Sequence, residues 1–235
     1  MRCAIKVIPK LNLNTKRRQE LNRNEFEVLE SVQHPHITRI YDLMEDRRNY
    51  YIVAELMSGG NVMEKILAAQ GNKFTETKAA SIINQMLLAL NFMHKKQIMH
   101  RDLKPENILC EIAADMNLDD IVIKLTDFGF AVKYNAGKKE TLSLGSPLYM
   151  APELCKETHY DFKVDCWAVG VIAFVLLTGT PPFYDKTSKR GKEGIYDAVI
   201  KDEPDYDLLS GVSKDSAAFI KKALKKDPTE RASIQ

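Results

Sequence analysis

Residues 100–107, His-Arg-Asp-Leu-Lys-Pro-Glu-Asn, bring three different polar groups together in one short stretch. Asp102 has a carboxylate that only accepts hydrogen bonds, Lys104 has an ammonium group, and Asn107 has an amide oxygen. Phosphoryl transfer needs these groups, because it depends on positioning a hydroxyl, neutralising phosphate charge and holding magnesium. Asp102 can take the hydroxyl proton, Lys104 can face the moving phosphate, and Asn107 can bind the metal. We interpret the rest of the chain as organised around this loop.

The composition is that of a folded, soluble protein, with 45% hydrophobic and 28% charged residues in a chain of 235. This length allows one large domain or two smaller lobes with a sizeable core. The formal net charge of +2 is too small to indicate nucleic acid or an anionic membrane surface as a partner. We therefore expect neither partner.

The cysteines indicate a reduced, intracellular protein, in the cytoplasm or the nucleus. All four are far apart and form no C-x-x-C pair, so neither a disulfide framework nor a zinc site is predicted. The longest apolar run, residues 168–177, is about half of what a membrane span needs. We expect no membrane-spanning segment.

Lys6 is the only charge in the apolar run 3–8, which reads as a buried strand. A lysine in such a run needs an anionic partner. Residues 16–32 have apolar side chains at helical spacing, and Glu25 falls on the inner side of that helix. Glu25 is thus the candidate partner, and the alternative is a glutamate that simply faces solvent.

The loop at 100–107 resembles the catalytic loop of protein kinases, H-R-D-L-x-x-x-N, at every fixed position. Asp-Phe-Gly at 127–129 and Ala-Pro-Glu at 151–153 resemble the two ends of the kinase activation segment. The resemblance implies that Lys6, paired with Glu25, holds the α- and β-phosphates of ATP, and that Asn107 and Asp127 bind Mg²⁺. ATP and Mg²⁺ are therefore the expected cofactors.

The same resemblance implies an α+β, bilobal fold with a reduced sheet in the N-lobe and a mainly helical C-lobe. The partial N-lobe would span residues 1–57 and the C-lobe residues 58–235. Strands at 37–43 and 50–55 would form a hairpin that leads into a hinge at 56–60. Nucleotide contacts would come from Ala4, Leu109 and the backbone of Glu55 and Met57, with the small Ala54 behind the adenine.

In the C-lobe, the apolar stripe from Ile82 to Met93 predicts a helix that leads to the catalytic loop. Residues 168–177 are hydrophobic all round and predict a buried helix, ended by residues 181–183. By resemblance, Asp165 anchors the backbone of the catalytic loop. Arg231, after a last helix near 216–224, would form a buried ion pair with Glu153.

The segment between the two motifs contains Thr141, Ser143 and Ser146 as candidate phosphorylation sites. Arg101 is a cation with which a phosphate there could pair. The position that kinases usually phosphorylate aligns with Leu142, which argues against obligatory activation by phosphorylation. Glu140 is expected to supply a permanent negative charge nearby.

Lys-Pro-Glu at 104–106 resembles the serine/threonine class, and residues 123–131 and 178–183 resemble the calcium/calmodulin-dependent kinase group. The expected partners are ATP and protein substrates with serine or threonine hydroxyls. In this group Glu106 helps to hold an arginine upstream of the modified residue, whereas Asn61 replaces a second expected acid. A preference for basic substrates is our hypothesis.

Kinases carry a glycine-rich loop, G-x-G-x-x-G-x-V, before the lysine strand, and only five residues precede Lys6 here. A fragment, a shortened kinase and a pseudokinase would each explain this difference. The alternative functions are a kinase-fold binding module and a nucleotide sensor that transfers no phosphate. Two further segments have simpler interpretations: the acidic cluster at 115–120 as a hairpin turn, and the basic cluster at 186–192 as a solvated loop.

Overall fold

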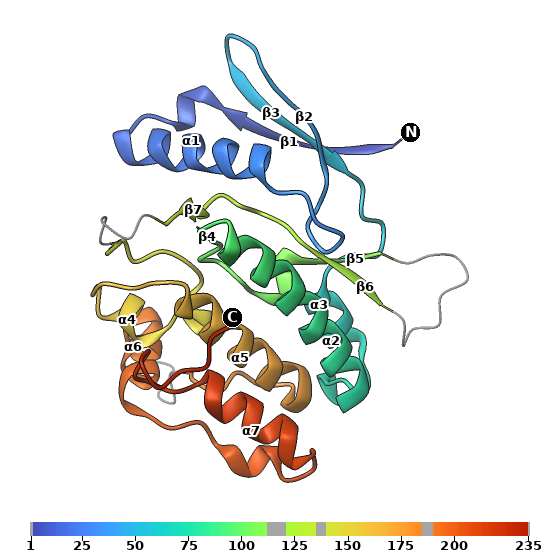
Figure 1. Cartoon of the computed structure of the whole chain (residues 1–235), viewed down its shortest axis with the longest axis vertical. Helices are drawn as coiled ribbons and strands as arrows, with labels where there is room; N and C mark the ends of the chain where they lie inside the picture. The colour runs from blue at the N-terminus through green and yellow to red at the C-terminus, as the bar shows by residue number, and fades with distance from the viewer. Residues whose placement is uncertain (1, 112–120, 135–139, 185–189, 235) are drawn as a thin grey trace.

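The computed structural model describes residues 2–111, 121–134, 140–184 and 190–234 of the chain. Its fold is α+β, with a small antiparallel sheet and one long helix above a mainly helical part (Figure 1). This arrangement confirms the predicted fold class. The turn expected at 115–120 and the basic side chains at 186 and 189 lie outside the described residues.

The sheet has the order β1-β3-β2, with antiparallel pairs between β1 (Cys3–Pro9), β3 (Asn49–Glu55) and β2 (Ile40–Glu45). Helix α1 (Lys16–Ser31) follows the short 3-10 helix η1 (Lys10–Asn12). It begins where the Thr15 side chain accepts a hydrogen bond from the Arg18 N–H, which satisfies one unpaired amide of the first turn. The buried side chains of α1 include Val28, Leu29 and the predicted Glu25.

The hairpin is present, but its first strand begins at Ile40 and not at residue 37. The residues before it pair with the helical part instead. Ile37 forms a parallel bridge with Leu125, and the Thr38 N–H donates to the Leu125 carbonyl at 2.9 Å. The apolar run from 37 to 43 thus contributes to two sheets. The pattern of hydrophobic residues alone does not show where one pairing ends and the other begins.

Helix α5 (Lys163–Thr178) is the centre of the helical part, and every residue from 164 to 177 is buried. It contacts α3 (Glu76–Lys95) and α7 (Lys214–Ala223). The helix ends before the prolines that were expected to stop it, because Gly179 adopts a left-handed conformation with φ of 78° and caps it. The remaining helices are α2 (Val62–Ala68), α4 (Pro152–Cys155) and α6 (Gly191–Lys201), with short 3-10 turns η2 (Gln70–Asn72), η4 (Pro147–Tyr149) and η5 (Tyr206–Leu209).

Two short strand pairs hold the loop at 100–107. Strand β4 (Ile98–Met99) pairs with β7 (Val132–Lys133), and β5 (Ile108–Glu111) pairs with β6 (Val122–Leu125). The loop runs from β4 to β5 and ends in the 3-10 turn η3 (Pro105–Asn107). Both ends of this polar loop are therefore fixed by backbone hydrogen bonds in the middle of the molecule (Figure 1).

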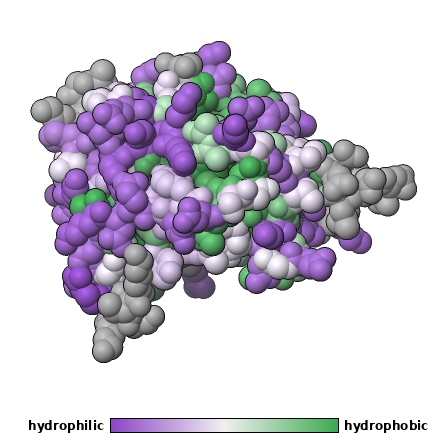
Figure 2. Space-filling model, turned by 90° about the horizontal axis from the view of Figure 1, so that it is seen from below, coloured by the Kyte–Doolittle hydropathy of each residue, from purple (hydrophilic) through white to green (hydrophobic). Residues whose placement is uncertain are grey.

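Hydrophilic side chains dominate the end of the molecule formed by the helical part, with hydrophobic side chains gathered toward its middle (Figure 2). Two residues of the basic cluster at 186–192 have defined places in the structure. Arg190 forms an ion pair with Asp197, and Lys192 belongs to α6 rather than to a loop. Among the described residues, no helix combines the length and the apolar character required to span a bilayer.

Candidate active site

Asp165, in the first turn of α5, holds the backbone of the loop at 100–107. Its carboxylate accepts the amide N–H groups of His100 and Arg101, both at 3.0 Å, and lies 2.9 Å from the His94 ring nitrogen Nε2. Burial alone would raise the pKa of Asp165, but the hydrogen bond and charge of His94, with contributions from His100 and the Arg101 amide, lower it below its ordinary value. The loop is thus anchored to the buried central helix.

Asp102 is the centre of a compact polar cluster. Its Oδ2 atom accepts from Lys104 Nζ at 3.0 Å and from Asn107 Nδ2 at 3.1 Å. Its Oδ1 atom accepts from the Ser146 hydroxyl at 3.0 Å, and this hydroxyl oxygen itself accepts from Lys104 Nζ at 2.9 Å. Asp102 is buried, so these donors replace the water that a carboxylate would otherwise bind.

Lys6 connects the sheet, α1 and the segment after β6. Its Nζ atom lies 2.7 Å from Glu25 Oε1 and 3.0 Å from Asp127 Oδ1. Burial opposes the charge of Lys6, but Glu25 and Asp127 outweigh it and raise the pKa of the lysine. Burial likewise opposes ionisation of Asp127, but Lys6, with smaller contributions from His100 and the Gly129 amide, lowers the pKa of this carboxyl. Both groups therefore stay charged at neutral pH.

Two of these residues have an unusual backbone. Arg101 and Asp127 are not glycines, yet their φ angles are 68° and 59°. This left-handed conformation costs a side chain of ordinary size about 1–3 kcal/mol. The anchoring of the loop by Asp165 and the pairing of Asp127 with Lys6 hold these conformations in place.

The side chains of Asn107 and Asp127 fit a hard cation that prefers oxygen ligands. The Asn107 side chain uses its nitrogen, Nδ2, to donate to the carbonyl and the carboxylate of Asp102. This orientation leaves the amide oxygen as its metal-ligating atom. The Asp127 carboxylate is 46% exposed and has a lowered pKa, so a cation can reach an ionised group.

A cavity of about 270 Å³ lies between the sheet and the helical part. Lys6, with its two partners Glu25 and Asp127, is part of its lining. Of the other predicted nucleotide contacts, Ala4, Glu55 and Leu109 line it, whereas Met57 does not. The Glu55 N–H donates to the Arg39 carbonyl at 3.0 Å, so this N–H is not available to a ligand.

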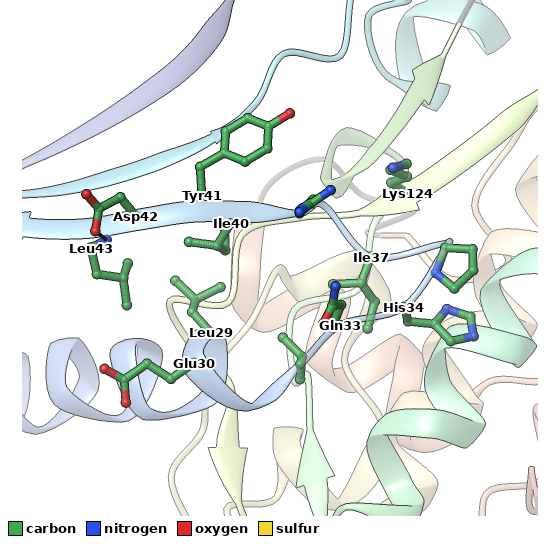
Figure 3. Close-up of a pocket in the computed structure, with 13 residues that line it drawn as sticks. Leu29, Glu30, Gln33, His34, Ile37, Ile40, Tyr41, Asp42, Leu43 and Lys124 are labelled. Atoms are coloured by element: carbon green, nitrogen blue, oxygen red, sulfur yellow. Dashed lines mark hydrogen bonds between the residues drawn. The ribbon is translucent and has the colours of Figure 1, made fainter.

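A second cavity, of about 770 Å³, adjoins the first and lies between α1, β2 and residues 33–37 (Figure 3). Ile40 of β2 points toward Leu29 of α1, and Tyr41 points to the opposite side of the strand (Figure 3). Leu29 and Ile40 line both cavities and form the wall between them. The larger cavity contains none of the residues of the Asp102 cluster.

Comparison with known protein families identifies the family to which this chain belongs. The protein kinase domain family matches the chain over residues 1–235. The chain belongs to this family. In this kinase domain, Lys6 of the sheet pairs with Glu25 of α1, and Asp102 pairs with Lys104 in the loop below them. This geometry agrees with the assignment.

Three curated relatives are similar to this kinase domain. The probable serine/threonine-protein kinase fhkD of Dictyostelium discoideum is 38% identical over 250 residues, with 99% of this chain and 32% of the relative covered. Calcium-dependent protein kinase 4 of Plasmodium falciparum is 37% identical, with 94% and 40% covered. Calcium/calmodulin-dependent protein kinase type 1B of Homo sapiens is 37% identical, with 99% and 64% covered. The chain thus spans about one third to two thirds of the length of these relatives.

The remaining predicted residues of the kinase domain occupy distinct places. Glu153 and Arg231 form a buried pair, with contacts of 2.6 and 2.9 Å between the two oxygens and the two guanidinium nitrogens. Glu106 is exposed beside the Asp102 cluster. Asn61, at the position of a second expected acid, is the N-cap of α2 and forms a reciprocal capping box with Glu64.

Sequence reasoning missed two contributions to the site. Ser146 was considered as a phosphorylation site, but its hydroxyl joins Asp102 and Lys104. No local pattern around Ser146 indicates this role. Lys124 of β6 binds both Glu55 oxygens, at 2.7 and 2.8 Å, and ties β3 to the helical part. No local pattern indicates that contact, because the two residues are far apart in the sequence.

Proposed function

We propose that this chain transfers the γ-phosphate of ATP to serine or threonine hydroxyls of protein substrates. The observation that carries the proposal is the cluster in which Asp102, Lys104 and Ser146 contact one another, with Asn107 bound to the same aspartate. In such a cluster a hydroxyl-bearing side chain, here Ser146, already lies at hydrogen-bond distance from both the carboxylate and the ammonium group. A substrate hydroxyl would use the same two groups.

In the proposed reaction, the substrate hydroxyl oxygen forms a bond to the γ-phosphorus, and the bond from this phosphorus to the β–γ bridging oxygen breaks. Asp102 accepts the hydroxyl proton, and ADP leaves. Lys104 stabilises negative charge on the moving phosphoryl group. Lys6, oriented by Glu25, holds the α- and β-phosphates. A magnesium ion bound by the oxygens of Asn107 and Asp127 would neutralise phosphate charge.

The substrate preference is proposed from Glu106. This carboxylate is exposed on the turn that follows Lys104, so it can pair with a basic side chain of a bound peptide. We expect peptides with an arginine upstream of the serine to be preferred over alanine-substituted peptides, and Glu106→Gln to reduce this preference. A peptide array without an arginine effect would contradict this part of the proposal.

The central experiment measures phosphate transfer from Mg-ATP to a basic serine peptide. We expect the wild-type chain to be active and Asp102→Asn to lose at least about a hundredfold in kcat, since a positioned base contributes 10²–10⁴-fold. Asp207→Asn, which changes an exposed aspartate in η5, is the matched control and should keep the wild-type rate.

The outcomes separate the proposed function from its alternatives. Transfer that persists in Asp102→Asn would contradict the role of the aspartate. Binding of Mg-ATP without transfer would indicate a nucleotide sensor, and neither binding nor transfer would indicate a binding module.

A further inference from the structure

A third cavity, of about 180 Å³, lies beside the C-terminal end of α7. It shares no lining residue with the two cavities described above and contains none of the residues of the Asp102 cluster. Half of its lining residues are lysines, and the full lining consists of Glu203, Tyr206, Lys221, Leu224, Lys225 and Lys226. Three positive charges therefore face a single negative charge, and the cavity is electropositive.

Lys226 is a partly buried cation, and none of the carboxylates that the structure describes forms an ion pair with it. Its Nζ atom donates to the Val199 carbonyl at 2.5 Å and lies 4.0 Å from the centroid of the Phe183 ring. Burial lowers the pKa of Lys226 to about 8, and the charges of Glu203 and Asp202 offset this effect only in part. An anion in the cavity would supply the charged partner that this ammonium group lacks.

The other polar residues of the lining can also donate hydrogen bonds. Lys221 Nζ lies 5.1 Å from the centroid of the Tyr206 ring. Burial, together with the charge of Glu203, raises the pKa of Tyr206 to about 12, so its hydroxyl keeps its proton at neutral pH. Lys225 lies 3.8 Å from Glu230, and both side chains are more than half exposed, so this ion pair is weak. Lys221 and Lys225 can therefore turn toward an anion in the cavity.

We propose that this cavity is a binding site for a phosphate group, held by Lys226 together with Lys221, Lys225 and the Tyr206 hydroxyl. A phosphate group carries a charge of about −1.5 to −2 at pH 7 and several acceptor oxygens, so it gains more from three lysines than a carboxylate does. The cavity is smaller than the pockets of about 300–1,000 Å³ that take drug-sized ligands, which favours a compact anion. Free phosphate and a phosphoserine side chain both present this group.

The first test measures the Tm against the concentration of inorganic phosphate, with sodium chloride keeping the ionic strength constant. A ligand that binds only the folded chain raises the Tm in a saturable way, and the curve gives its Kd. We expect Lys226→Met to raise this Kd at least about tenfold, because a hydrogen bond to a charged group is lost. Lys221→Met should also raise it, and this variant keeps the bond of Lys226 to Val199. Lys222→Met, at the adjacent exposed position outside the lining, is the matched control and should keep the wild-type Kd.

Two further variants distinguish this site from other cationic sites of the chain. Glu203→Gln removes the one negative charge of the lining, so we expect it to bind phosphate several-fold more tightly than the wild type. Lys6→Met changes a lysine of the cavity of about 270 Å³ and should leave the response to phosphate intact. The inference thus stands or falls independently of the proposed function.

A phosphoserine peptide, beside the same peptide without the phosphate, identifies the source of the group. Binding of the phosphopeptide that is tighter than that of inorganic phosphate, and weaker in Lys226→Met, would support the site with a phosphorylated protein as its ligand. Phosphate binding that the peptide does not exceed would support the site with the free anion as its ligand. A Tm that does not respond to phosphate would overturn the inference, as would an unchanged Kd in both Lys226→Met and Lys221→Met, a loss of binding in Lys6→Met, or an equal loss in Lys222→Met.

Discussion

Ala54 lines the cavity of about 270 Å³ in which we propose that ATP binds, and Ile52 and Leu29 line the same cavity. Its methyl group takes up less of the cavity than a longer side chain would. We expect an ATP-competitive inhibitor with a bulky aromatic group directed past residue 54 to inhibit the wild type at least about tenfold more strongly than Ala54→Met, a difference of about 1.4 kcal/mol. The measurement is the inhibition constant of each protein. The same compound without the bulky group is the control, and equal inhibition by the bulky compound would contradict the prediction.

Asp165 gives a second prediction at this scale, because its carboxylate holds two amides of the catalytic loop. Replacement by asparagine should lower the free energy of unfolding by roughly 1.5–3 kcal/mol at pH 7, the range for hydrogen bonds to a charged group. The folded-state pKa of Asp165 is lowered. Its contribution to stability is therefore fully present above the unfolded-state pKa of about 3.9 and is lost as the pH falls toward the folded-state value.

Urea unfolding of the wild type and Asp165→Asn over a series of pH values checks this prediction. The difference between the two proteins should be constant at neutral pH and should shrink below about pH 4. Asp207→Asn, at an exposed site, should differ little from the wild type at any pH. A difference that grows on acidification would show that the pKa of Asp165 is raised.

Among the structural elements, the segment that follows α7 is attached to α4 through one buried ion pair. Arg231 donates to both Glu153 oxygens, and also to the carbonyls of Lys163 and Lys225. Glu153→Ala would leave this buried guanidinium without its anionic partner, which typically costs about 3–5 kcal/mol. We expect a large drop in the yield of soluble protein and in the midpoint of denaturant unfolding. Glu193→Ala, in the exposed part of α6, should have little effect, and a Glu153→Ala protein of wild-type stability would contradict the prediction.

The elements also show which features the sequence could predict. The apolar run at 168–177 predicted most of the buried part of α5, but the helix begins earlier, at Lys163, and its burial begins at residue 164. Its first turn carries Asp165, a polar residue that is buried only because it binds the catalytic loop. Hydrophobic periodicity cannot detect a residue that is buried by its hydrogen bonds. The later start of β2 has a different cause, because the apolar Ile37 pairs with Leu125 of β6.

The residues of the candidate site were likewise only partly predictable from the sequence. Motifs with fixed spacing, such as the loop at 100–107, pointed to Asp102, Lys104 and Asn107, and the structure brings these three side chains together in one cluster. Contacts between distant segments were not predictable from local patterns, and the bonds of Ser146 to Asp102 and of Tyr160 to Arg101 belong to this class. They depend on how the segment 140–146 packs, which is a property of the tertiary fold.

At the scale of the whole molecule, the cavity of about 270 Å³ is lined by two parts of the chain. Ala4 and Lys6 come from the sheet, and Leu109 and Asp127 come from the helical part. A ligand that contacts both parts stabilises the folded chain as a unit, by about 2.7 kcal/mol at a hundred times its Kd. For a chain of this size we expect Mg-ATP to raise the Tm by roughly 5–10 °C. Thermal unfolding with and without Mg-ATP measures this effect.

The variant that tests this coupling is Lys6→Met, because Lys6 is bound to both Glu25 of α1 and Asp127 of the helical part. Methionine keeps much of the length of the side chain but removes the charge that the phosphates require. We expect the variant to lose most of the Mg-ATP shift, whereas Lys201→Met, at an exposed position of α6, should keep it. Equal shifts in the wild type and Lys6→Met would mean that ATP does not bind between the two parts, and the proposed function would then lose its nucleotide site.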